Sequence, residues 1–369
     1  MNVLRLTLEH YRNLKSNTLT FSPGSNVIWG NNAQGKTNLL EAIWLFTGGH
    51  SFRGVKDSEL IAFGEERSAL TMDFFSEGRE QTIELLLENG RRKFTVNGVE
   101  KKSGADLIGK FCGVIFSPEH LSLVKGGPLL RRSFLDGALC QSKPGYAKEF
   151  VLYQRTLRQR NMLLKDLAKD PALLPTLEIW NQFLAARGMQ VIRQRQELLK
   201  GLKPDLQKIY SGLSNSKEAI GIRYVCSVSR EEELTEELFL ERLKETEKSD
   251  LLTGYTSVGP HRDDLEILID DVSARMYGSQ GQQRSAVLSL KLAEASILEE
   301  ITGEKPVVLL DDVMSELDAE RQEYLLNHVK DRQTFITCCD PHSIRSFKNG
   351  ALFYTEQGVV REKIPQSLS

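Results

Sequence analysis

Cysteine is scarce in this sequence, and the few thiols follow no metal-binding or disulfide pattern. The 369 residues include five cysteines, at positions 112, 140, 226, 338 and 339, and no two of them have the C-x-x-C spacing. An odd number without that spacing argues against a disulfide framework or a zinc site, and it is typical of a reducing cytoplasm. Cys338 and Cys339 lie in an apolar run, so we expect both thiols to be buried.

The sequence also lacks an excess of either charge and any long apolar run. It contains 48 Lys and Arg against 50 Asp and Glu, for a net charge of -2. That balance excludes nucleic-acid binding through a uniformly basic surface. The 40% of hydrophobic residues exclude an unstructured chain. No run reaches the roughly 18 apolar residues of a membrane span, and no basic-then-apolar leader follows Met1. We expect a cytoplasmic protein without membrane contact.

The balanced total conceals a partition of charge along the chain. Residues 125–203 contain 15 basic and 6 acidic residues, a net charge of +9, so the remainder carries -11. Part of that negative charge lies in residues 231–250, where nine residues are acidic and three are basic. One basic block within an acidic remainder differs from an evenly mixed surface.

Periodicity divides the chain into three parts. Strand patterns begin the chain, and residues 68–99 have the pattern of an antiparallel meander with Asn-Gly turns at 89–90 and 97–98. From about 145 to 212 only helical patterns occur, broken near 170–175, which predicts a short helical hairpin. Strands and helices alternate again past residue 251. We therefore expect an α/β domain built from residues 1–144 and 251–369, with a helical domain at 145–250 inserted into it.

A glycine-rich segment between a predicted strand and a predicted helix matches the phosphate-loop pattern G-x-x-x-x-G-K-[ST]. In such loops the backbone N–H groups close around phosphates at the start of a helix. Lys36 would neutralise the β- and γ-phosphates of a nucleotide and Thr37 would hold Mg²⁺. The residues of the loop are Gly30, Asn31, Asn32, Ala33, Gln34, Gly35, Lys36 and Thr37.

Two carboxylates follow an apolar strand pattern at residues 307–310. Asp311 is placed to bind Mg²⁺ directly or through water, and Asp312 to orient or deprotonate an attacking water. An acidic turn after a strand is a common structural feature, but beside a phosphate loop the catalytic interpretation is favoured.

The third segment, residues 278–284, opens a predicted helix. Ser279 and the free N–H groups around Gly281 would form an anion site at the helix N-terminus. Alternatively, Ser279 is an N-cap with Gln282 as its capping-box partner. The two interpretations are compatible.

These segments resemble the Walker A, signature and Walker B motifs of ABC-type ATPases, and residues 315–318 resemble their D-loop. Within that group the chain is most similar to the RecF family, which has an SMC-like head. The resemblance covers about residues 3–340 and is weakest in the helical block. Further matching segments are 11–14, 117–119, 125–126, 131–132, 134–136, 259–264 and 309–318.

The resemblance implies an ATP-gated mechanism that needs two copies of the chain. The family fold is an SMC-like P-loop ATPase head assembled from both chain ends. Ser279, Gly281 and Gln282 of one copy would touch the γ-phosphate held at Lys36 of the other, so that ATP and Mg²⁺ hold a head-to-head homodimer. The family binds DNA, single- and double-stranded and at gapped junctions, and works with RecO and RecR to load RecA during recombinational repair.

Several positions depart from the wider ATPase pattern. Asp312 stands where many ABC ATPases have Glu, which implies slow turnover. The usual switch histidine has no counterpart in residues 336–340, and Glu119 is the nearest polar candidate for the missing Q-loop glutamine. His120 stands where the family commonly has Asp.

Some interpretations stay open. Arg155, Arg158 and Arg160 are either a solvated helix face or contacts to DNA phosphates. Residues 11–12 either pack the first strand or contact the nucleotide, and His261 is structural by default but fits a position near it. The alternative function is the cytosolic ATP-binding subunit of a membrane transporter, against which stand the missing Q-loop glutamine and switch histidine.

Overall fold

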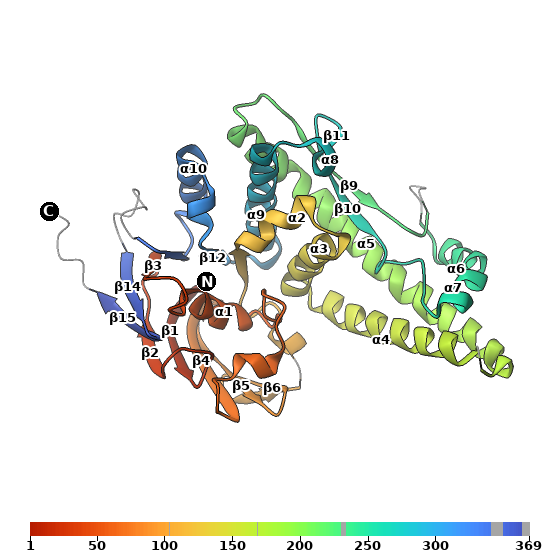
Figure 1. Ribbon diagram of the computed structural model, residues 1–369, viewed down its shortest axis with the longest axis horizontal. Coiled ribbons are helices and arrows are strands. Elements are labelled where there is room, and N and C mark those ends of the chain that lie inside the picture. The colour runs from red at the N-terminus through yellow and green to blue at the C-terminus, as the bar shows by residue number, and fades with distance from the viewer. Residues whose placement is uncertain (103, 168, 230–233, 341–349, 364–369) are drawn as a thin grey trace.

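The computed structural model describes residues 1–369 except 103, 168, 230–233, 341–349 and 364–369. Its strands form three sheets, and two long helices extend to one side of them (Figure 1). Within the described residues no helix is long and apolar enough to cross a membrane.

The central sheet combines strands from both ends of the chain, as predicted. Its order is β15-β14-β3-β13-β12-β8, parallel from β14 to β8, with β15 antiparallel at one edge. Every residue of β12 and β13 is buried, because apolar side chains of a parallel sheet are covered on both faces. The strands are β3 (Ser25–Trp29), β8 (Gly113–Phe116), β12 (Val307–Asp311), β13 (Thr334–Cys338), β14 (Gly350–Glu356) and β15 (Val359–Lys363).

A second sheet is the predicted antiparallel meander, with the order β2-β1-β4-β5-β6-β7. Asn89, Gly90, Asn97 and Gly98 all have positive φ, which tight hairpin turns require and Asn-Gly pairs tolerate. Its strands are β1 (Asn2–Glu9), β2 (Asn17–Thr20), β4 (Arg67–Ser76), β5 (Arg79–Glu88), β6 (Arg91–Val96) and β7 (Val99–Lys101).

The helices pack on the central sheet and form the arm. Alternate residues of the central strands belong to two cores: Ile28 and Leu309 pack with the first helix and the meander, whereas Val27 and Leu310 pack with the later helices. The α-helices are α1 (Lys36–Leu45), α2 (Ser122–Lys125), α3 (Pro128–Ser142), α4 (Pro144–Leu167), α5 (Leu174–Leu213), α6 (Glu236–Glu245), α7 (Glu247–Thr253), α8 (Ala274–Tyr277), α9 (Gln280–Thr302) and α10 (Ala319–Val329). Short 3₁₀ helices cover Asp57–Leu60, Gly104–Leu107, Pro118–Leu121, Pro171–Leu173 and Val313–Glu316.

Helices α4 and α5 form the predicted hairpin and make up the arm seen in Figure 1. Helix α5 is 40 residues long, and it packs against α9 and a third sheet as well as against α4. That sheet has the order β11-β10-β9, with β9 (Ile220–Val225), β10 (Asp264–Ile269) and β11 (Val272–Ser273). Strand β9 was not predicted, so the region between the two parts of the central sheet is not purely helical.

Buried ion pairs join the arm to the rest of the molecule. Arg160 on α4 and Asp250 on α7 are both fully buried, with Nη1 2.8 Å from Oδ2. On α5, Arg195 forms a two-pronged pair with Asp136 of α3, at 2.8 and 2.9 Å. The interpretation of Arg160 as a solvated or phosphate-binding residue is therefore wrong, because its charge is enclosed and paired. Arg155 and Arg158, by contrast, are exposed.

Candidate functional site

The phosphate-loop segment forms the turn between β3 and α1. Gly30 has φ 150°, and a Cβ there would lie 2.3 Å from the backbone oxygen of Thr355 on β14, so only glycine fits. Gly35 caps α1 in a left-handed conformation, with φ 108°, and a Cβ would lie 2.6 Å from the Leu14 side chain. The backbone therefore needs both glycines of the pattern.

Lys36 begins α1 and folds back over the loop. Its Nζ donates to the carbonyl oxygens of Gly30 at 2.6 Å and Asn31 at 3.0 Å, and the side chain is buried. Cys339 at the end of β13 places its Sγ 3.8 Å from the same Nζ. Cys339 is exposed, so the expectation that both adjacent thiols are buried is wrong for this one; Cys338, inside the strand, is buried.

The outer part of the loop is exposed and fixed by its neighbours. Asn31, Asn32 and Ala33 are exposed, and Gln34 is half-buried. Three hydrogen bonds hold the segment: Cys339 Sγ to Asn32 Oδ1 at 3.1 Å, Asn13 Nδ2 to the Ala33 carbonyl at 3.3 Å, and the Gln357 backbone N to Gln34 Oε1 at 2.5 Å.

The carboxyl ends of β12 and β13 bring the Asp311 carboxylate and the Thr337 hydroxyl to the phosphate loop, where they meet Thr37 of α1. Asp311 Oδ1 accepts from Thr37 Oγ1 and from Thr337 Oγ1, both at 2.9 Å. Burial raises the pKa of the Asp311 carboxyl, the two threonine hydrogen bonds oppose that rise, and the charge of Glu119 adds to it. Glu119, the candidate for the missing Q-loop glutamine, thus acts electrostatically on Asp311, and its role stays a prediction. Thr337 was not predicted as a site residue, although the end of a parallel strand adjoining both motif strands is a signal for it.

Asp312 adopts a strained backbone conformation, with φ 51° at a residue that is not glycine. Its N–H donates to Thr337 Oγ1 at 2.9 Å, and its carbonyl accepts from Ser315 Oγ at 2.7 Å. The two bonds hold the main chain in place on both sides of the half-buried side chain.

His120, in the 3₁₀ helix that carries Glu119, contacts Ser117 Oγ through Nδ1 at 3.0 Å, and burial lowers its pKa to about 3.

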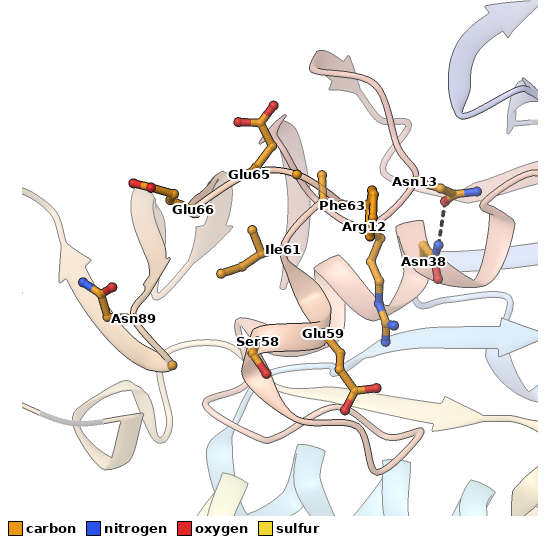
Figure 2. Close-up of a pocket in the computed structure, with 13 residues that line it drawn as sticks. Arg12, Asn13, Asn38, Ser58, Glu59, Ile61, Phe63, Glu65, Glu66 and Asn89 are labelled. Atoms are coloured by element: carbon orange, nitrogen blue, oxygen red, sulfur yellow. Dashed lines mark hydrogen bonds between the residues drawn. The ribbon is translucent and has the colours of Figure 1, made fainter.

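An open cavity of about 920 Å³ adjoins the loop on the side of the meander. Figure 2 shows its lining: Asn13 and Asn38 lie beside each other at one end, and Arg12 and Phe63 lie next to them. Asn38 Nδ2 donates to Asn13 Oδ1 at 2.6 Å. Sequence reasoning did not identify this cavity, because its walls come from segments far apart in the chain: residues 12–13, Asn38 of α1, residues 58–66 and the turn at 89–90.

Tyr11 and Arg12 stabilise the wall of this cavity through a buried carboxylate on α1. Glu41 is fully buried and accepts from Tyr11 Oη at 3.1 Å, from the Arg12 guanidinium at 2.9 Å and from Ser51 Oγ at 2.5 Å. Tyr11 is thus a packing residue, whereas Arg12 both pairs with Glu41 and lines the cavity.

His261 is a structural residue: its Nδ1 lies 2.6 Å from Tyr153 Oη, and burial lowers its pKa to about 4.

The signature-like segment lies away from α1, at the end of α9 that adjoins α8 (Figure 1). Ser279 is the N-cap of α9, and Gln282 completes the predicted capping box: Ser279 Oγ accepts from the Gln282 N–H at 3.2 Å and Gln282 Oε1 from the Ser279 N–H at 2.7 Å. Ser279 is exposed, and Gly281 and Gln282 are half-buried. The single chain therefore brings together the phosphate loop, Asp311 and Asp312, but not Ser279, Gly281 and Gln282.

Comparison with known proteins agrees with this arrangement. Residues 2–361 match the family described as RecF/RecN/SMC N terminal domain. The chain is 43% identical to the DNA replication and repair protein RecF of Ruminiclostridium cellulolyticum over 92% of each chain. It is 40% identical to that of Acetivibrio thermocellus over 97% of this chain and 99% of the other.

Solved structures give the same result. The structure described as the recombination mediator protein RecF-ATP in the RecFOR pathway superposes with a TM-score of 0.92, at 40% identity over 98% of both chains. The Smc head domain of Pyrococcus furiosus shares the fold only, with a TM-score of 0.56 and 16% identity. The predicted fold class, an SMC-like ATPase head assembled from both chain ends, is thus confirmed, and the chain belongs to the RecF family of DNA replication and repair proteins.

Proposed function

We propose that this protein is an ATP-dependent DNA-binding protein of recombinational repair, in which ATP joins two copies of the chain. The observation that carries the proposal is the division of the motif residues between two surfaces. Lys36, Thr37 and Asp311 meet at one site, whereas Ser279 is exposed at the start of another helix. A nucleotide bound at the first surface needs a second copy to meet the signature segment.

Residues 30–37 hold the triphosphate. Lys36 Nζ donates to the backbone oxygens of Gly30 and Asn31, which places its ammonium at the loop that would hold the phosphates. Its ammonium neutralises phosphate charge, while the N–H groups at the start of α1 donate to the phosphate oxygens. Adenosine enters the 920 Å³ cavity beside Asn13 and Asn38.

Thr37 and Asp311 fit a magnesium ion. Their oxygens lie 2.9 Å apart, and no described group of three or more His, Cys, Asp or Glu residues forms a closed metal cage. Mg²⁺ typically takes one or two protein oxygens, with water and phosphate oxygens filling the other positions. When bound, the ion would supply charge neutralisation at the β- and γ-phosphates.

Asp312 is the catalytic carboxylate that orients the attacking water. Its main chain is fixed at Thr337 and Ser315, so the side chain starts from a constrained position. Aspartate is one methylene shorter than the glutamate of many ABC ATPases, and turnover is correspondingly slow. The ATPase rate of Asp312→Asn tests this role: a rate equal to that of the wild type would exclude Asp312 as the catalytic group.

Dimerisation controls DNA binding. Two copies joined by ATP present two basic arms to the same DNA, including gapped junctions. The exposed Arg155 and Arg158 on α4 are the contacts to phosphates. The protein acts with RecO and RecR to load RecA in the cytoplasm; support for those partners is that a similar solved protein is described as a recombination mediator of the RecFOR pathway. A transporter subunit is not favoured, because the curated relatives given above are DNA replication and repair proteins.

The experiment is size analysis of the protein with ATP, with ADP and without nucleotide. A monomer-to-dimer shift is expected with ATP alone, and it should be lost in Lys36→Arg and in Ser279→Arg. Ser249→Arg, which adds the same charge at an exposed serine on α7, is the matched control and should dimerise normally. A shift that survives Ser279→Arg would exclude capping by the signature segment of a second copy.

DNA affinity is the second part of the test. Affinity for gapped duplex should rise with ATP and fall steeply with salt, because each phosphate contact releases counterions. Affinity that is unaffected by both would exclude the ATP-gated mechanism.

A further inference from the structure

Two large side chains next to the signature segment are mostly exposed to solvent. Met276 is 71% exposed and Tyr277 is 76% exposed, and they end α8 just before Gly278 and Ser279. Among the described residues, no hydrogen bond, ion pair or ring contact involves the Tyr277 side chain. Exposing a tyrosine and a methionine side by side leaves apolar area in water that a binding partner would cover.

The backbone that carries these side chains is held firmly. Gln283 is buried, and its Nε2 donates to the carbonyls of Ala274 at 3.0 Å and Gly278 at 2.9 Å. A Cβ at Gly278 would lie 2.5 Å from the Ala274 carbonyl oxygen, so the tight turn needs glycine. The short helix also packs on α2 and β10. An aromatic side chain on a fixed backbone has only two rotatable side-chain bonds to order, so it binds with little loss of conformational entropy.

The proposed nucleotide site has a cavity that is open on one side, where a side chain of a second copy could enter. The cavity beside the phosphate loop is open to solvent, and polar residues such as Asn13, Asn38 and Glu59 line it together with the apolar Ile61 and Phe63 (Figure 2). Phe63 is the one aromatic residue among those that line it, and its side chain is fully exposed. A purine base has two faces that stack on aromatic rings, and this wall offers at most one such ring.

We propose that Tyr277 of each copy completes the nucleotide site of the other by lying against the nucleoside of the bound ATP, with Met276 beside it. The inference rests on the proposed ATP-dependent dimer and adds to it a residue that senses the nucleoside rather than the phosphates. The partner's Tyr277 closes the open side of the cavity.

Chain geometry supports this placement. Tyr277 lies two residues before Ser279, so their Cα atoms are at most about 7 Å apart, and the tyrosine side chain adds to that reach. If Ser279 meets the γ-phosphate, the ring is within reach of the nucleotide. In a two-fold dimer the contact occurs twice, so one substitution removes both copies of it.

The test is ATP-dependent dimerisation of Tyr277→Ala and Tyr277→Phe as a function of protein concentration. Base stacking on an aromatic ring is worth enough that Tyr277→Ala should dimerise about 10-fold less tightly or worse. Tyr277→Phe keeps the ring and should lie within about twofold of the wild type. Val272→Ala, at an exposed apolar residue of β11, is the matched control and should also behave as the wild type. ATP binding by the dilute monomer should be the same in every variant.

A second nucleotide separates nucleoside contact from protein contact. With ribose 5′-triphosphate, which has no base, wild type and Tyr277→Ala should dimerise with equal affinity. An equal loss with ATP and with ribose 5′-triphosphate would show that the ring does not stack on the base, which overturns the inference, as would unchanged dimerisation of Tyr277→Ala with ATP. Failure of the wild type to dimerise with ATP is a different result, and it would refute the proposed function itself.

Discussion

Replacement of Arg160 by methionine should destabilise the arm more than any exposed substitution. The guanidinium donates to Asp250 Oδ2 at 2.8 Å, to Thr256 Oγ1 at 2.7 Å and, from Nε, to Asn181 Oδ1 at 2.8 Å. Both charges of the ion pair are fully buried. Arg160→Met would leave Asp250 charged and without its cation in a water-free interior.

The expected loss of unfolding free energy follows from that geometry. Removing one partner of a buried ion pair costs about 3–5 kcal/mol, because the remaining charge stays desolvated. At a urea slope near 3 kcal/mol/M, the midpoint of unfolding should fall by about 1 to 2 M. Replacing both charges, as in Arg160→Met with Asp250→Leu, should recover most of the loss, because no uncompensated charge remains.

Tryptophan emission during urea unfolding gives the assay, because Trp180 lies on α5 next to Asn181, which binds Arg160. The matched control is Arg158→Met, two residues away on the same helix but exposed, with an expected change within about 0.5 kcal/mol. If Arg160→Met unfolds at the same urea concentration as Arg158→Met, the buried pair does not hold the arm. DNA affinity should instead fall more in Arg158→Met than in Arg160→Met, because Arg158 is the exposed residue.

Three further predictions concern single groups. Burial lowers the pKa of His261 to about 4, below its unfolded value of about 6.5. Because the unfolded chain takes up this proton first, the free energy of unfolding decreases as the pH falls from 6.5 toward 4. His261→Gln has no such group, so its free energy of unfolding should fall less steeply over that pH range in an acid titration. Cys339 is the exposed thiol, so it should react faster with a disulfide reagent near neutral pH than the other four cysteines. Bound ATP should slow this reaction, because Cys339 Sγ contacts Asn32 and lies 3.8 Å from Lys36 Nζ. An equal reaction rate with and without ATP would contradict the position of Cys339 at the nucleotide site. Gly30→Ala should abolish ATP binding in a direct binding titration, since the added methyl group would collide with the backbone of Thr355; retained binding would show that the loop can relax.

Local sequence was sufficient to predict the two motif segments because their structure depends on neighbours in the chain. Asp311 ends a short run of apolar residues that is typical of a buried strand, and Lys36 follows a glycine-rich turn between a strand pattern and a helix pattern. The capping box at Ser279 is local for the same reason. These predictions needed no knowledge of which segments meet in space.

The residues that sequence reasoning missed depend on contacts between distant segments. Thr337 is a site residue only because β13 lies between β3 and β12, so that its hydroxyl reaches Asp311. Cys339 is exposed because the chain leaves the sheet beside the phosphate loop at this residue. The apolar run in the sequence does not show where the strand ends. Arg160 has its partner 90 residues away on another helix.

The same distant pairs change what the basic block can do. Of its +9, the charge of Arg160 is balanced by Asp250 and that of Arg131 by Asp264, and both acids lie outside residues 125–203. Lys244, also outside the block, balances Glu178 within it in the same way, so residues 125–203 keep a net charge of +8 for contact with DNA. Since each phosphate contact contributes a slope of about -0.9 to the salt dependence of binding, a single arm is a weak ligand at physiological salt. Two arms brought together by ATP double the number of contacts on one DNA, and affinity rises with that number exponentially. A near-neutral chain with a partly neutralised arm is therefore suited to bind DNA as a dimer and to release it as a monomer.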